Sequence, residues 1–209
     1  MHPQLKMKIT KIFYFILFLL LSSDVFAQNT ALSDKLTKLH SMQAHFSQTI
    51  HDAHGRVLDQ SEGTMALQRP GKFRWETIKP HQQLVIVSEK VIWIYDKDLA
   101  QAVKQKRRSE NNSFSPALLL SSTNQKILED FIITENKKNI FLLKPRKDRE
   151  LFKKIILQFN QEALQSMTME DQLGQNTSVQ FSNIKLNKPI PERDFIFKPT
   201  HDTEVIDQT

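Results

Sequence analysis

The chain has 209 residues, a formal net charge of +6, seven histidines and no cysteine. The missing cysteine excludes disulfide bonds, a thiol nucleophile and a lipid-bearing cysteine, and four glycines are too few for phosphate-binding loops. A net charge this modest does not predict nucleic-acid binding, which requires a concentrated basic face.

The N-terminal segment, residues 1–27, has the pattern of a cleaved secretory signal peptide. Three lysines precede the apolar run Ile12–Leu21, and Val25–Ala27 resembles a small-x-small cleavage site. The run is too short to span a bilayer, which needs roughly 20 residues; an uncleaved anchor is the alternative. Cleavage after Ala27 would leave residues 28–209, the size of one soluble domain, with a net charge of about +4.

The first element predicted beyond this segment is an amphipathic helix at residues 31–45. Leu32, Leu36 and Leu39 recur at three- and four-residue spacings and form a narrow apolar face. From Phe46 the pattern changes to alternation, which is typical of strands. Strands are predicted near 46–51, 57–68, 72–78, 83–88, 91–95 and 99–104, with a hairpin turn at 51–55.

Two short helices are predicted between residues 112 and 130. Ser115 followed by Pro116 is a favourable helix start. Ser122 with Gln125 is a capping-box pattern that would open the second helix. Strands are predicted to resume at 131–135, 139–144, 151–159, 164–170, 176–186 and about 194–198.

About ten or eleven short strands in one domain predict a mainly-β fold with short helices. A strand set of this size usually curls into a barrel or a strongly bent sheet, and the helices would cover its opening. An outer-membrane barrel is the alternative. Several of the strands look too short for that, and the polar C-terminus lacks a membrane-facing aromatic residue.

No catalytic or metal-binding constellation stands out. His51 and His54 flank Asp52 with a spacing that could hold a metal weakly, but a surface turn is the favoured interpretation. Neither a GxSxG, a Walker-type nor an HExxH motif occurs. The basic runs at 104–108 and 144–149 are explained as well by solvated edges or turns. The sequence therefore predicts neither an enzyme nor a cofactor- or metal-binding protein.

The segment 65–76 places an arginine among apolar residues. Counting by twos defines one strand face, provided the register survives Pro70-Gly71. Arg69 could lie at a strand end and extend into water. Alternatively, it could stand at the rim of an apolar interior and donate to helix-end carbonyls of the covering segment, since a guanidinium offers five donors. The face contains Met65, Leu67, Arg69, Gly71, Phe73 and Trp75.

These residues resemble a known family, the periplasmic outer-membrane lipoprotein carrier proteins (LolA). The resemblance covers nearly all of the chain after residue 27, and its most specific part is RPGKFRW (69–75) followed by VSEKVIWIYD (87–96). It also includes AHFSQTI (44–50), SPALLL (115–120) and FIFKPT (195–200). The chain departs from well-known members at Gly71-Lys72 and in the basic run at 104–108, which concerns partner contacts and not the fold.

The resemblance implies an unclosed, strongly curved antiparallel β-barrel with a helical lid over an apolar cavity. It also implies a periplasmic carrier that accepts triacylated lipoproteins from an inner-membrane ABC transporter and passes them to an outer-membrane lipoprotein receptor. A monomer is expected, although the sequence does not determine the oligomeric state. The family's functional arginine falls on Arg69, which is expected to hold the lid segments 31–45 and 115–129 in the closed state.

Two sets of side chains are expected to serve this carrier, with ordinary core packing as the alternative for the cavity set. The expected lid residues are Leu32, Leu36, Leu39, Pro116, Leu118, Leu119 and Leu120. The expected cavity residues are Met65, Leu67, Phe73, Trp75 and Trp93.

Three other functions remain possible at this stage. A sensing domain of a periplasmic stress-response regulator shares the architecture, but such proteins carry an additional domain and this chain ends soon after residue 200. An enzyme acting on envelope lipids or glycans would need an acid–base pair, and none is visible. A general phospholipid shuttle is compatible with the same sequence features.

Overall fold

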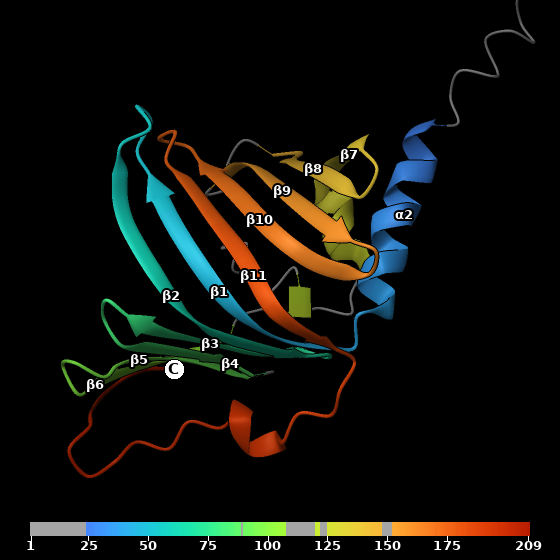
Figure 1. The fold of residues 1–209 in the computed structure, drawn as a ribbon. Helices are drawn as coiled ribbons and strands as arrows, with labels where there is room; N and C mark the ends of the chain where they lie inside the picture. Colours follow the sequence, from blue (N-terminus) through green and yellow to red (C-terminus); the bar gives the residue numbers. More distant parts are fainter. Residues whose placement is uncertain (1–23, 89, 108–119, 122–124, 148–151) are drawn as a thin grey trace, which may run out of the picture.

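A single twelve-stranded sheet dominates the computed structural model, which describes residues 24–88, 90–107, 120–121, 125–147 and 152–209 (Figure 1). Within these residues, helix α2 precedes the sheet, and two short 3-10 helices interrupt the strand sequence. The elements are α2 (Asp24–Lys38), β1 (Ser41–His51), β2 (Val57–Gln68), β3 (Lys72–Lys79), β4 (Gln83–Val87), β5 (Val91–Asp96), β6 (Gln101–Lys106), η1 (Gln125–Asp130), β7 (Phe131–Lys137), β8 (Ile140–Pro145), β9 (Phe152–Asn160), β10 (Ala163–Asp171), β11 (Asn176–Leu186), η2 (Glu192–Phe195) and β12 (Glu204–Gln208).

The strand order is β12-β6-β5-β4-β3-β2-β1-β11-β10-β9-β8-β7. Every neighbouring pair is antiparallel except β12 and β6, which run parallel. The first strand therefore lies in the middle, joined to β2 on one side and to β11 on the other. The sheet is open, with β7 and β12 as its edges. The predicted mainly-β fold with an unclosed sheet is confirmed, with twelve strands in the described part of the chain where ten or eleven were expected.

The helix predicted at residues 31–45 is misplaced, because α2 ends at Lys38 and β1 follows it. Met42, Ala44 and Phe46 are buried, and the residues between them are less so. That alternation is the strand period. It begins earlier than expected because β2 and β11 offer hydrogen-bond partners along both edges of β1.

The strand predicted at 194–198 is wrong. The chain forms η2 there and adds β12 beyond it. Phe195 is buried against Ala66, and the ring of Phe197 lies 5.0 Å from that of Trp93. The apolar alternation in this segment thus reflects packing across the sheet, not pairing within it.

The main core lies between α2 and one face of the sheet, here called the inner face. It is one continuous cluster to which α2 and strands β1–β4 and β7–β11 contribute buried apolar residues. In Figure 1, α2 stands beside β7, and the C-terminal segment with η2 runs below β3–β6. Burying one large apolar side chain contributes about 1.5–3 kcal/mol, so this cluster is the main source of stability.

Of the two helices predicted between 112 and 130, most lies outside the described residues, including the predicted starts at Ser115 and Ser122. Pro116, Leu118 and Leu119 also fall outside. Leu120 and Ser121 are described and buried, and η1 follows them.

Candidate functional site

The predicted alternation across Pro70-Gly71 is confirmed by the pairing of β2 with β3. Met65 lies opposite Trp75, and Leu67 lies opposite Phe73. Directly paired residues on antiparallel strands point to the same face. All four side chains belong to the main core on the inner face, and Trp75 is half-buried there.

An aromatic cluster surrounds Trp75 on this face. Its ring stacks on Phe46 with centroids 3.7 Å apart, lies 6.1 Å from Phe73 and meets the ring of Phe181 edge-on at 6.5 Å. Gly63 makes this packing possible, because a Cβ there would lie 1.9 Å from a main-chain oxygen and 2.8 Å from the Phe46 ring. Such ring pairs contribute about 0.5–1.5 kcal/mol each beyond their buried area.

Trp93 does not join this cluster. It pairs with Ile86, whereas the inner-face residue Phe73 pairs with Val87, one position further along β4. Because side chains alternate along a strand, Trp93 points to the opposite face. There its ring lies 5.0 Å from Phe197 and below the Lys104 ammonium. The expectation that Trp93 lines the interior is therefore corrected.

The helix residues expected in the lid do pack on the inner face. Leu32 and Leu36 of α2, and Leu39 directly after it, are buried in the main core together with Leu120. The apolar stripe was thus identified correctly, although the helix that presents it ends seven residues earlier than predicted.

Arg69 connects the two covering segments. Its Nη1 donates to the carbonyl oxygen of Leu36 in α2 at 2.5 Å, and its Nε donates to that of Leu120 at 2.8 Å. Its main-chain N–H donates to the carbonyl of His40 at 2.9 Å. The side chain is half-buried and turned to main-chain carbonyls instead of extending into water.

The guanidinium of Arg69 has neutral acceptors. Among the described residues it forms no ion pair, and its Nη2 has no hydrogen-bond partner there. Burial lowers the pKa of Arg69 to about 10, which still leaves it charged at neutral pH. A buried cation whose acceptors are carbonyls is bound less strongly than one paired with a carboxylate. The contact can therefore be broken at moderate cost.

Arg107 supports the turn that carries Arg69, and sequence reasoning missed it. Its Nη1 donates to the carbonyls of Gly71 at 3.1 Å and Ser88 at 2.9 Å, while the Gly71 N–H donates to the carbonyl of Ser121 at 2.9 Å. In the sequence, Arg107 is one member of the basic run at 104–108. Only the register of β4–β6 brings it to the β2–β3 turn.

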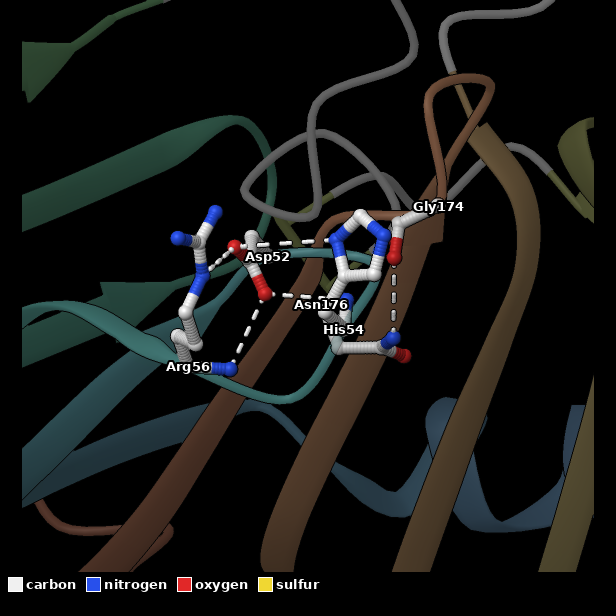
Figure 2. Close-up of polar contacts among 5 residues, drawn as sticks. All are labelled: Asp52, His54, Arg56, Gly174 and Asn176. Atoms are coloured by element: carbon white, nitrogen blue, oxygen red, sulfur yellow. Dashed lines mark hydrogen bonds and ion pairs between the residues drawn. The ribbon is translucent and has the colours of Figure 1, made fainter.

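The turn at 51–55 is the predicted β1–β2 hairpin, and its carboxylate serves the turn (Figure 2). Asp52 accepts from the N–H groups of His54 and Arg56, each at 2.9 Å, and from the Arg56 Nε at 2.6 Å. The hydrogen bond from the Arg56 N–H is the main cause that lowers the Asp52 pKa. Among the described residues, no three His, Asp or Glu side chains lie close enough together to hold a metal ion.

The β1–β2 turn lies beside a second turn, which connects β10 with β11 (Figure 2). Asn176 donates to the carbonyl of Gly174 at 3.1 Å, and a Cβ on Gly174 would come within 3.0 Å of Ala53.

Within the described part of the chain, no helix combines the length and apolar character that crossing a bilayer requires.

The family model "Outer membrane lipoprotein carrier protein LolA" matches residues 37–198. An outer-membrane lipoprotein carrier protein of Legionella pneumophila is 39% identical over 200 residues, covering 93% of this chain and 98% of that protein. One from Coxiella burnetii is 38% identical over 195 residues, covering 90% and 92%. The chain therefore belongs to the LolA family of outer-membrane lipoprotein carrier proteins.

Among solved structures, an uncharacterized conserved protein from Thermus thermophilus superposes with a TM-score of 0.52 at 14% identity, covering 87% of this chain and 99% of that one. This likeness concerns the fold alone. Family membership confirms the resemblance found in the sequence motifs. The protein is a periplasmic lipoprotein carrier and not an enzyme.

Proposed function

We propose that this carrier holds the acyl chains of triacylated lipoproteins against the inner face of its sheet, and that Arg69 keeps the empty protein closed. The lid in this proposal is α2 together with the segment 115–129. A strongly curved half-barrel enclosing an apolar cavity is part of the same proposal. The observation that supports this proposal is that the Arg69 guanidinium donates to the main-chain carbonyls of both Leu36 in α2 and Leu120 in the second segment.

The magnitudes favour a lid over a permanently open pocket. Three acyl chains carry on the order of 45 methylenes at about 0.8 kcal/mol each, a nominal ~36 kcal/mol. Non-covalent binding reaches at most roughly 18–21 kcal/mol. Incomplete burial or the work of opening the lid must offset the rest. Moving α2 would expose Leu32 and Leu36, which are buried in the closed form, and this cost would allow cargo to leave again.

The expected cavity residues divide in this proposal. Met65, Leu67, Phe73 and Trp75 lie on the inner face beneath the lid and are proposed to meet the acyl chains. Trp93 is not included, because its side chain lies on the other face.

The partners follow from the task of a lipoprotein carrier. We propose that an inner-membrane ABC transporter loads the protein and that an outer-membrane lipoprotein receptor unloads it, with the transporter supplying the energy. We also propose that residues 1–27 are removed on export, leaving 28–209 as one domain. Cleavage after Ala27 would remove Asp24–Ala27 from the start of α2 and keep its buried Leu32 and Leu36.

Replacing Arg69 by Leu tests the latch. Without the two hydrogen bonds the closed state is less favoured, so cargo should still bind but its transfer to the receptor should fall about tenfold or more. Transfer is measured in a reconstituted assay with purified carrier and receptor. Arg56→Leu, the same change in the distant β1–β2 turn, is the control. Transfer at the wild-type rate by Arg69→Leu would remove the latch from the mechanism.

The identity of the cargo is tested separately. Mass spectrometry of material that co-purifies with the protein from the periplasm should find triacylated lipoproteins. Phospholipid without lipoprotein would favour a general lipid shuttle.

A further inference from the structure

Asn187 lies where the lid helix joins the sheet. Its Nδ2 donates to the carbonyl of Lys38, the last residue of α2, at 3.0 Å. Its Oδ1 accepts from the N–H groups of His40 at 2.8 Å and Ser41 at 3.2 Å. One amide side chain therefore holds both ends of the short connection, Leu39 and His40, between α2 and β1.

The main chain fixes Asn187 to β1. Its N–H donates to the carbonyl of Ser41 at 2.8 Å, and the Ser41 hydroxyl donates to the carbonyl of Lys188 at 2.7 Å. Its φ of 54° is left-handed, a conformation that asparagine adopts more readily than most residues. Asn187 is thus anchored on the sheet and reaches the helix through its side chain.

The two elements that Asn187 joins are held unequally. β1 is hydrogen-bonded to β2 and β11 along its length, so it cannot leave the sheet without breaking both ladders. The described contacts of α2 are apolar side chains, the Arg69 bond, a Lys35 bond to the Gln161 carbonyl and the exposed pair Lys38–Glu162. If the lid opens, α2 moves and β1 stays, with rotation at Leu39 and His40.

We propose that Asn187 is the positioning residue of the lid hinge. It keeps the C-terminal end of α2 at a fixed point on β1, so that the helix swings about Leu39–His40 when cargo enters. The hydrogen bonds of Arg69 and Asn187 then behave differently. The Arg69 bond to Leu36 breaks on opening, while the Asn187 bonds to His40 and Ser41 persist in both states. This inference rests on the proposed function, in which α2 is part of a lid.

Three variants distinguish a role of Asn187 in the hinge from a general effect on stability. Asn187→Gly removes the side chain and still accommodates the positive φ. Asn187→Asp keeps an acceptor for His40 and Ser41 and loses the donor to Lys38. Asn183→Gly is the matched control, because Asn183 also has a left-handed φ, of 51°, and lies in β11 shortly before Asn187 with an exposed side chain.

The lid is opened in two ways, with a synthetic triacylated lipopeptide and, without cargo, by Arg69→Leu. Amide hydrogen exchange is followed at His40 and Ser41 and along α2. With Asn187 intact, both treatments should speed exchange in α2 and leave His40 and Ser41 slow. Asn187→Gly should speed exchange at His40 and Ser41 about tenfold in every state, and Asn187→Asp should not. Transfer of the lipopeptide should fall in Asn187→Gly relative to Asn183→Gly.

The hinge is refuted if His40 and Ser41 lose protection whenever the lid opens in otherwise wild-type protein. It is equally refuted if Asn187→Gly and Asn183→Gly behave alike in exchange and transfer. A lipopeptide that binds none of the proteins would contradict the proposed function, while the Arg69→Leu measurements would still decide the hinge.

Discussion

The two faces of β2–β5 are covered by different segments, and different interactions hold each segment in place. The inner face is covered by α2 and the Leu120 segment through apolar contacts and one guanidinium donating to carbonyls. The outer face is covered by the C-terminal segment, which is held by charged side chains of β3 as well as by apolar contacts. Lys72 pairs with Glu192 at 2.5 Å, and Arg74 donates to the carbonyl of Asp194 at 3.2 Å.

This difference suggests what each cover is for. A neutral acceptor can be exchanged for another without stranding a negative charge, and apolar side chains can exchange helix for acyl chain. The outer cover combines the partly exposed Lys72–Glu192 pair, which contributes at most about 1 kcal/mol, with the burial of Phe195, and an acyl chain could not replace that ion pair. We therefore assign movement to the inner cover and permanence to the outer one, and the following experiments test that contrast.

The largest effect is expected at Gly63, beneath the inner aromatic cluster. Gly63→Ala would drive a Cβ to 1.9 Å from the Glu76 carbonyl oxygen and 2.8 Å from the Phe46 ring. We expect a loss of at least about 4 kcal/mol in the free energy of unfolding, because a backbone oxygen must move. Urea denaturation measures it. Gly55→Ala, which meets nothing within 4 Å and carries only the strain of a positive φ, should cost about 1 kcal/mol.

A pair of truncations compares the two covers directly. Phe195→Ala in the outer segment should lower the free energy of unfolding by about 3 kcal/mol and leave lipopeptide transfer per folded molecule unchanged. Leu36→Ala in α2 should cost about 2 kcal/mol and alter transfer. Stability and transfer are measured on the same preparations. Equal effects of both variants on transfer would contradict the division of roles.

A smaller effect is expected at Arg107, which braces the turn carrying Arg69. Arg107→Gln removes a charged donor to the carbonyls of Gly71 and Ser88 and should cost about 2 kcal/mol. It should also reduce cargo transfer, because Arg69 is then less well placed. Arg107→Lys, which keeps a donor, should restore part of the transfer. Lys106→Gln, an exposed neighbour, is the control and should match wild type in both measurements.

The smallest effect is expected at Glu76 on the outer face. Burial opposes ionisation there, but hydrogen bonds from Lys97 at 2.6 Å and Arg74 at 2.8 Å lower the Glu76 pKa below its ordinary 4.5. A carboxyl group whose pKa is lower in the folded protein than in the unfolded chain stabilises the fold at pH values above its unfolded-state pKa. This stabilisation is lost as the pH falls through the folded-state pKa. Glu76→Gln should therefore cost about 1 kcal/mol at pH 7.

The pH dependence provides the check on this assignment. The difference in unfolding free energy between wild type and Glu76→Gln should shrink as pH falls below about 4.5. A difference that stays constant down to pH 3 would mean that the ionised carboxylate is not its source. Transfer at pH 7 should not change, since the outer cover is not expected to move.

Much of the architecture could be predicted because strand and helix periods differ. The alternation in β2 and β3 placed Met65, Leu67 and Phe73 on one face, as the register has it. The same method failed for Trp93, because its face depends on the register of β4 and β5. It failed at residues 194–198 as well, where Phe195 and Phe197 of an alternating segment pack on the sheet and the segment does not join it as a strand.

The sequence by itself determined the succession of strands, the apolar stripe of α2, the family, and the unusual position of Arg69 among apolar residues. These follow from patterns within a few residues, where geometry is local. The tertiary structure alone decided which carbonyls Arg69 meets, that Arg107 braces its turn, and that Asn187 reaches Lys38 and His40. Those contacts join residues 33 to 149 positions apart in the sequence, and no local pattern encodes a proximity that only the register of the sheet and the packing of α2 create.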